Sequence, residues 1–171
     1  MAGREITGAL LKDMLRGAAE VLDKNKERVN ALNVFPVPDG DTGTNMGLTL
    51  TAAVREAENA AGDLSKVAAA ASMGSLMGAR GNSGVILSQF FRGVSIAWAD
   101  KSVAGPKDVA QAFLEATRTA YRAVMKPVEG TMLTVVRIAA KEALVAARRG
   151  SDVETVLKAA LTGARTALQE T

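Results

Sequence analysis

Two aspartates separated by a single glycine are the residues of this sequence with the clearest capacity for chemistry. Asp39 and Asp41 lie in the stretch Asn-Val-Phe-Pro-Val-Pro-Asp-Gly-Asp-Thr-Gly-Thr-Asn, which spans 33–45. Carboxylates this close raise each other's pKa unless a positive charge is shared between them, and a divalent cation is the usual partner of such hard oxygen ligands. Pro36 and Pro38 bias the preceding backbone toward an extended form, so we expect a stiff arm to present the two carboxylates.

The aspartate loop is open to more than one interpretation. Asp-Gly-Asp-Thr-Gly is also typical of a solvated surface turn, and turn statistics alone do not separate that structure from a metal site. An EF-hand calcium loop is excluded, because counting from Asp39 puts Thr44 where glycine is required and Leu50 where a bidentate glutamate is required. Magnesium needs only one or two carboxylates together with waters and substrate phosphates, so it suits a site with few ligands.

A glycine-rich segment, Gly-Ala-Arg-Gly-Asn-Ser-Gly at 78–84, is the second candidate site. It leads into an apolar helical pattern over 85–98, and the free amides and dipole at a helix N-terminus favour anions. The segment lacks the Gly-Lys-Ser/Thr of a P-loop and the preceding strand of a dinucleotide-binding motif. A plain corner between two helices explains the same residues, so both interpretations remain open here.

The composition limits what kind of protein this is. The 171 residues fit one domain, and 48% hydrophobic but only 4% aromatic residues indicate a core of Ala, Leu, Val and Met, which favours helices. There is no cysteine or histidine, so carboxylates, amides, hydroxyls and backbone groups must do any chemistry. The net charge is +3, with basic residues scattered rather than clustered, which argues against a nucleic-acid partner. No apolar run approaches the ~20 residues of a membrane helix and no secretory segment is recognisable, so we expect a cytoplasmic protein.

Hydrophobic periodicity and capping residues predict seven helices in a single all-α domain over 1–171. Thr7 and Thr131 are expected to cap the first and sixth helices, and Ser151 with Glu154 forms a capping box for the seventh. The polar patch 23–28 is expected to bend or interrupt the first helix. The predicted helices span about 7–32, 44–60, 64–79, 85–98, 106–125, 131–150 and 151–168.

The methionines are predicted to fill the core rather than to line a ligand site. Four of them fall on helix faces that the periodicity assigns to the interior: Met14, Met46, Met73 and Met77. Phe90 and Phe91 are likewise interpreted as packing residues.

Short connections between helices of similar length favour an up-and-down antiparallel bundle or barrel. Alternate loops of such a bundle lie at the same end. The aspartate loop, the 78–84 bend and the Gly130–Thr131 turn would therefore meet there, which strengthens three signals that are individually weak.

These segments resemble the DhaL-type nucleotide-binding domain of the dihydroxyacetone kinase family, and most of all the N-terminal domain of bacterial fatty acid kinase A subunits. The likeness rests on the motif at 30–46, Asn-Ala-Leu-Asn-Val-Phe-Pro-Val-Pro-Asp-Gly-Asp-Thr-Gly-Thr-Asn-Met. It rests also on 78–89, Gly-Ala-Arg-Gly-Asn-Ser-Gly-Val-Ile-Leu-Ser-Gln, and on Gly-Thr-Met at 130–132. It covers nearly the whole chain.

The resemblance implies a barrel of about eight antiparallel helices with ATP or ADP and two magnesium ions held at one end. Asp39 and Asp41 would be metal ligands that bridge the ions to the phosphates, and Asn33 would occupy the position of an earlier ligand. Dihydroxyacetone kinases have an aspartate there at slightly different spacing, so the neutral amide is a departure that bears on the second ion. The phosphates would be cradled by Thr42, Gly43, Thr44, Asn45, Asn82 and Ser83, and the turn with Thr131 and Met132 would lie against the base.

The resemblance also implies a reaction, a partner and an incomplete domain. The expected activity is ATP-dependent phosphorylation of a fatty acid on a separate carrier protein of the DegV-like type, giving an acyl phosphate. The family domain continues into a further helix and closing loop, so seven of about eight helices are expected here. The alternatives are a dihydroxyacetone kinase subunit and a non-catalytic helical module that binds lipid or a partner. A lipid in the barrel interior and a homodimer are further expectations.

Overall fold

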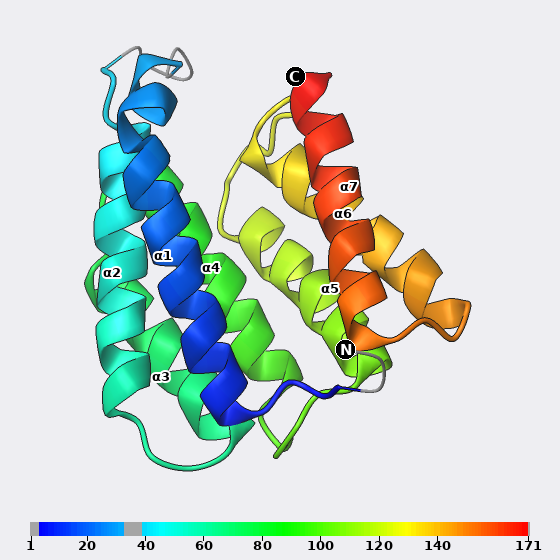
Figure 1. Ribbon diagram of the computed structural model, residues 1–171. Helices are drawn as coiled ribbons and strands as arrows, with labels where there is room; N and C mark the ends of the chain where they lie inside the picture. Colours follow the sequence, from blue (N-terminus) through cyan, green and yellow to red (C-terminus); the bar gives the residue numbers. More distant parts are fainter. Residues whose placement is uncertain (1–3, 33–38, 171) are drawn as a thin grey trace.

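Seven helices account for most of the residues that the computed structural model describes, which are 4–32 and 39–170 (Figure 1). Within these residues the only strand-like pairing is an isolated bridge between Ile6 and Ala104, so the all-α prediction is confirmed. The prediction of a stiff arm at Pro36 and Pro38 falls outside the described residues. The helices are α1 (Gly8–Ala31), α2 (Thr42–Asn59), α3 (Leu64–Met77), α4 (Gly81–Ala97), α5 (Pro106–Arg122), α6 (Met132–Arg148) and α7 (Val153–Gln169).

Side-chain caps fix where three of the helices begin. Thr7 Oγ1 accepts a hydrogen bond from the Leu10 amide at 3.1 Å, as the sequence predicts. Thr131 caps α6 in the same way. The predicted cap of α7 is wrong by one residue: Asp152, not Ser151, is the N-cap, and its carboxylate accepts from Thr155 N at 2.9 Å.

Two predicted helix boundaries and one predicted interruption differ from the structure. Helix α2 begins at Thr42 and α4 at Gly81, which places Asn82 and Ser83 in the first turn of α4 rather than before it. Helix α1 runs without a break through 23–28. Most side chains of 23–28 are exposed to solvent and leave the backbone hydrogen bonds of the helix intact, so the polar patch does not interrupt it.

The helices run alternately up and down, and each packs against the next in sequence (Figure 1). Further contacts of α2 with α4 and of α1 with α3 make α1–α4 one packed group, and α5–α7 form a second group that is joined to the first where α4 meets α5. Residues 39–41 and the connections at 78–80 and 123–131 lie at one end of this arrangement, and the connections at 60–63, 98–105 and 149–152 lie at the other. The predicted up-and-down topology is confirmed.

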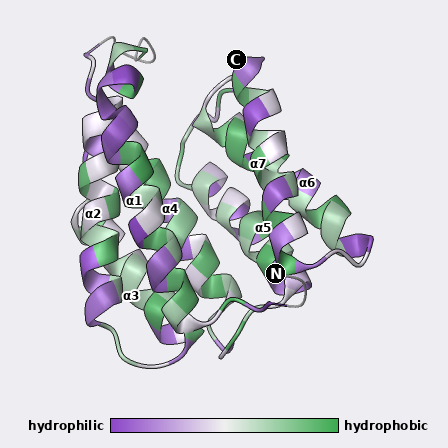
Figure 2. Cartoon of the chain, in the orientation of Figure 1, coloured by the Kyte–Doolittle hydropathy of each residue, from purple (hydrophilic) through white to green (hydrophobic). Residues whose placement is uncertain are grey.

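Small residues dominate the helix interfaces. Four alanines are fully buried: Ala53, Ala57, Ala116 and Ala143. Hydrophilic and hydrophobic residues alternate along each helix (Figure 2). At Gly93 the backbones of α4 and α5 come so close that a Cβ would lie 2.4 Å from the Ala116 Cα. Close backbone approach of this kind requires Gly and Ala at the contact.

Two of the four methionines predicted to be buried are exposed. Met73 is 55% exposed and Met77 is 74% exposed. The buried face of α3 instead carries Ala71, Gly74 and Ser75, where α3 packs closely on α2. None of the helices in the described residues has the length and hydropathy needed to cross a membrane.

Candidate nucleotide site at the loop end

The two aspartates stand directly before α2, at the same end of the molecule as the 78–80 and 123–131 connections (Figure 1). Asp41 is the N-cap residue of α2, and its carbonyl accepts from the Asn45 amide at 2.8 Å. Asp39 is exposed and Asp41 half-buried. The aspartates therefore flank a helix N-terminus whose dipole favours negative charge.

The side chains of Asp39 and Asp41 interact directly with each other. A hydrogen bond between the two carboxyl groups is the main cause that raises the pKa of Asp39, and partial burial and the like charge of Asp41 add to it. Two carboxylates this close are an arrangement that a divalent cation can bridge. Within the described residues no group of three or more acidic side chains could hold a metal, and the third predicted ligand, Asn33, lies outside them.

A side chain from the end of α1 holds the first turn of α2. Asn30 Oδ1 accepts from the Thr44 amide and Asn30 Nδ2 donates to Thr44 Oγ1, both at 3.0 Å. The close approach of α1 and α2 also explains the glycine at 43, because a Cβ there would lie 2.4 Å from the Lys26 carbonyl oxygen. Of the residues predicted to cradle phosphate, Gly43 and Thr44 thus also join α1 to α2.

The beginnings of α2 and α4 lie directly against each other. Thr49 Oγ1 donates to the Asn45 carbonyl at 2.8 Å and accepts from the Arg80 amide at 3.3 Å. Gly81 has a φ of +65°, and a Cβ on it would lie 2.5 Å from Asn45 Nδ2. The structure therefore brings the Asp39–Asn45 segment and the predicted anion site at Asn82 and Ser83 to one rim.

The third predicted segment lies at the same end, on the α5–α7 side (Figure 1). Thr131 Oγ1 donates to the Val128 carbonyl at 2.7 Å and accepts from the Leu133 amide at 3.3 Å, so the residue closes the turn and caps α6. Met132 is the first residue of α6 and is half-buried.

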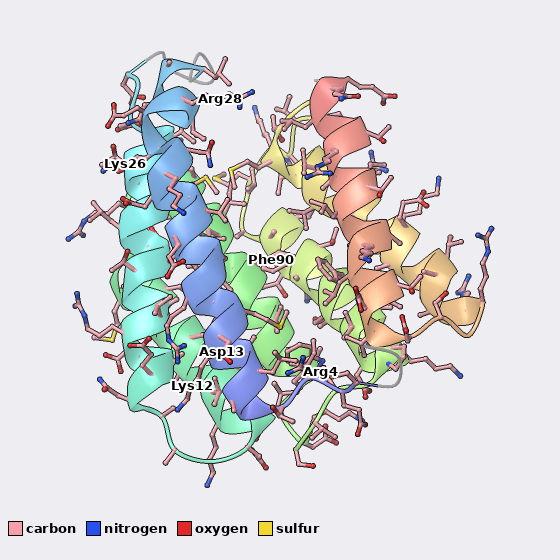
Figure 3. The ribbon with its side chains drawn as sticks, in the orientation of Figure 1. Arg4, Lys12, Asp13, Lys26, Arg28 and Phe90 are labelled. Carbon is pink, nitrogen blue, oxygen red and sulfur yellow. The ribbon has the colours of Figure 1, made fainter. Side chains whose placement is uncertain are left out.

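Basic side chains add positive charge to this end of the molecule. Lys26 and Arg28 project near the end of α1 (Figure 3), and Arg80 is the exposed residue that precedes α4. Cations beside two helix N-termini make the rim a suitable environment for a polyanion.

The sequence patterns predict no role for Asn30 or for a second set of residues at this end. Asn30 belongs to the 30–46 motif, but its bonds to Thr44 depend on how two helices pack. The second set, Tyr121, Glu129 and Arg137, forms a hydrogen-bonded cluster beside the α6 turn. No spacing rule marks these residues, because they come together only through the fold.

A partly open apolar cavity of about 160 Å³ lies between the helices, and none of the rim residues lines it. Phe90 lies between the two groups of helices (Figure 3) and makes edge-on contacts with Phe91 and Phe113 at centroid distances of 5.9 Å. The cavity lining comes from α1, α3, α4, α5 and α7 and from Ile6, and it includes Leu11, Met14, Phe90, Phe91, Trp98, Phe113 and Leu157.

Comparison with known proteins places the chain in a family. A family model described as the DAK2 domain matches residues 36–171. The chain is 46% identical over 172 residues to protein YloV of Bacillus subtilis (strain 168). The match covers 100% of this chain and 31% of YloV. It is 45% identical over 168 residues to an uncharacterized protein of Staphylococcus aureus (strain USA300), covering 98% of this chain and 31% of that protein. The chain thus spans about a third of the length of these relatives, and it belongs to the DAK2 domain family, the DhaL-type domains of the dihydroxyacetone kinase family.

Proposed function

We propose that this chain is the nucleotide-binding domain of a kinase that transfers a phosphoryl group from ATP to the carboxylate of a carrier-bound fatty acid. One observation carries the proposal: the aspartate pair before α2 and the first turn of α4 lie at one rim, joined through Asn45, Thr49 and Arg80. A carboxylate pair beside amide-rich helix starts is the combination that a metal-bound polyphosphate needs. Because the proposed reaction consumes ATP, the proposed location is the cytoplasm.

The donor set at the rim fits magnesium. Asp39 and Asp41 offer only oxygen ligands, they interact directly, and they are accessible, which suits a hard cation that keeps several waters. Bound there, magnesium would neutralise charge on the transferring phosphoryl group. Asn33 is proposed as a further ligand, for a second ion.

The protein's own residues would bind and orient the phosphates. The proposed contacts come from the first turn of α2, with Thr42, Gly43, Thr44 and Asn45, and from Asn82 and Ser83 in the first turn of α4. Thr131 and Met132 are proposed to lie against the base. Catalysis of phosphoryl transfer depends mainly on position and charge neutralisation, so the absence of histidine and cysteine from the sequence is no obstacle.

The acceptor and the partner are proposed from the resemblance at 30–46 and 78–89. A fatty acid on a DegV-like carrier protein is the proposed substrate, and regions of a longer protein are proposed to bind that carrier. A dihydroxyacetone kinase subunit is the other enzyme candidate. Phosphoryl-transfer assays on the longer protein, with a loaded acyl carrier or with dihydroxyacetone and a partner subunit, distinguish the two by which acceptor gains phosphate.

Isothermal titration of the 171-residue chain with ADP and Mg²⁺ tests the proposed site. Binding is expected for the unsubstituted chain, and Asp39→Asn/Asp41→Asn should weaken it by more than about tenfold, since even loss of an outer-shell partner costs a metal site about that much. Asp100→Asn is the matched control, because Asp100 is an exposed aspartate in the 98–105 connection at the opposite end. Equal affinities for the double variant and the unsubstituted chain would refute the role of the aspartates.

The apolar cavity favours a second candidate role, the binding of a lipid chain. Its volume of about 160 Å³ is close to that of engineered cavities that take up benzene, so it has room for one end of an acyl chain rather than a whole lipid. Native mass spectrometry separates the roles: retained lipid without nucleotide would favour this second candidate, and retained nucleotide with magnesium would favour the kinase domain.

A further inference from the structure

The connection between α5 and α6 is held by a closed cluster of three side chains. Tyr121 Oη donates to Glu129 Oε2 at 2.9 Å, while Arg137 donates from Nη2 to Glu129 Oε1 at 2.5 Å and from Nε to Tyr121 Oη at 3.3 Å. Tyr121 is in the last turn of α5, Glu129 in the connection and Arg137 in α6. Each member contacts the other two, so the cluster fixes the connection to both helices.

The residues next to Glu129 are tied down as well. Gly130 N donates to Thr134 Oγ1 at 2.8 Å, and Thr131 Oγ1 donates to the Val128 carbonyl. Gly130 has a φ of +82°, a conformation that other residues rarely adopt. The direction in which α6 begins therefore depends on where Glu129 is held.

Stability alone gives little reason for this cluster. Exposed ion pairs contribute little to folding free energy, and the side chains of Arg137 and Glu129 are 47% and 59% exposed. The connection itself buries little apolar surface, since Met125 is 98% exposed and Val128 is 48% exposed. A closed network on an exposed segment serves to hold a geometry rather than to stabilise the core.

We propose that Tyr121, Glu129 and Arg137 are positioning residues that hold the turn at Gly130–Met132 in the geometry that receives the nucleotide. The assignment rests on the proposed function, because it concerns the segment proposed to face the base. None of the three needs to touch the nucleotide. They act through the turn that they hold.

The test compares Tyr121→Phe, Glu129→Gln and Arg137→Lys with the unsubstituted chain in two measurements. Hydrogen exchange of the 124–133 backbone reports the order of the turn, and titration with ADP and Mg²⁺ reports affinity. Each variant should exchange faster in this segment and bind ADP about tenfold more weakly, since small displacements of binding groups carry costs of this size or more. Arg137→Lys should have the smallest effect, because lysine keeps the charge and loses only the forked geometry.

Glu115→Gln is the matched control. Glu115 also joins two arginines on α5, with Arg118 at 3.5 Å and Arg122 at 3.3 Å, but it does not contact the α6 turn. Its variant should leave both measurements unchanged. Circular dichroism checks that every variant folds, and if Tyr121→Phe does not, Glu129→Gln and Arg137→Lys carry the test.

The outcomes separate this assignment from the proposed function. Faster exchange together with weaker ADP binding supports it. Faster exchange with unchanged affinity, weaker binding without faster exchange, or no change in either overturns the assignment and leaves nucleotide binding standing. If the unsubstituted chain binds no ADP, the proposed function and this assignment both fail.

Discussion

Asn30 is the residue that connects two helices at the rim through one side chain. Its amide accepts from the Thr44 backbone and donates to the Thr44 hydroxyl, so it acts as a cap that comes from outside α2. Asp41 occupies the usual capping position without a side-chain cap hydrogen bond. The aspartate carboxylates are thus not needed to begin α2, which is consistent with a role toward a ligand.

Replacement of Asn30 should therefore affect both the fold and the proposed site. Asn30→Ala removes two hydrogen bonds to the first turn of α2, and we expect the free energy of unfolding to fall by about 1 kcal/mol. Urea unfolding followed by Trp98 fluorescence measures this, since Trp98 is the single tryptophan and is buried. Asn25→Ala is the control, because Asn25 is exposed and its side-chain amide donates within its own helix, to the Val21 carbonyl at 2.8 Å. Equal losses in the two variants would contradict the role of Asn30 as a cap.

Residue-scale features could be predicted from the sequence where the chemistry is local. Thr7 and Thr131 cap helices that begin directly after them, so their residue types and positions were sufficient. Asn30 and Thr44 are 14 positions apart, and the Tyr121 cluster spans 16 positions. Contacts at such separations depend on how helices pack, which capping rules do not describe.

Helix packing in this protein depends on close backbone approach, and single glycines show where. Gly93→Ala would place a Cβ 2.4 Å from the Ala116 Cα and 2.6 Å from the Glu115 carbonyl oxygen. Neither backbone can move without separating α4 from α5, so we expect a loss of about 1 to 3 kcal/mol in urea unfolding. Gly17 lies on the exposed side of α1 and a Cβ there would meet nothing within 4 Å, so Gly17→Ala should instead stabilise the protein by about 0.5 to 1 kcal/mol. The opposite signs of the two changes in the free energy of unfolding distinguish a packing effect from helix propensity. A Gly93→Ala variant as stable as the unsubstituted chain would contradict the packing role of Gly93.

The N-cap of α7 gives stability that depends on pH. Two hydrogen bonds from Thr155 lower the pKa of Asp152 below its ordinary value. The larger effect comes from the Thr155 side chain and the smaller from its backbone N–H. The folded state therefore favours the ionised carboxylate, and this contribution is complete above the unfolded pKa of about 4 and is lost as pH falls through the folded value. Asp152→Asn should lower the urea midpoint at pH 7, and its difference from the unsubstituted chain should shrink below about pH 4. A difference that stays constant down to pH 3 would show that the charge is not involved.

The hydrophobic periodicity of the sequence predicts the wrong buried face for α3. Small residues of α3 at positions 71, 74 and 75 occupy the interface, while Met73 and Met77 point outward. Ala, Gly and Ser give little hydropathy signal, so the methionines determined the predicted face. Ser75 is buried without penalty because its hydroxyl donates to the Ser72 carbonyl of the same helix.

At the scale of the whole molecule, topology determines which loops can form one site. The seven helices of the described residues alternate in direction, which places residues 39–41 and the 78–80 and 123–131 connections at the same end. Helix number and order follow from periodicity, so this arrangement could be predicted from the sequence. Two other features could not be predicted from the sequence, because both depend on distances between helices. They are the contact of Asn45 with Gly81 and the cluster that holds the α6 turn.

One nucleotide and its metal are proposed to lie together at this rim. Amide NMR spectra of the 171-residue chain, recorded with ADP and paramagnetic Mn²⁺ in place of Mg²⁺, test this placement directly. We expect signals from 39–45, 81–84 and 130–133 to broaden together, while those from 60–63, 98–105 and 149–152 remain sharp. Broadening centred on the second set of connections, or spread evenly over the chain, would contradict it.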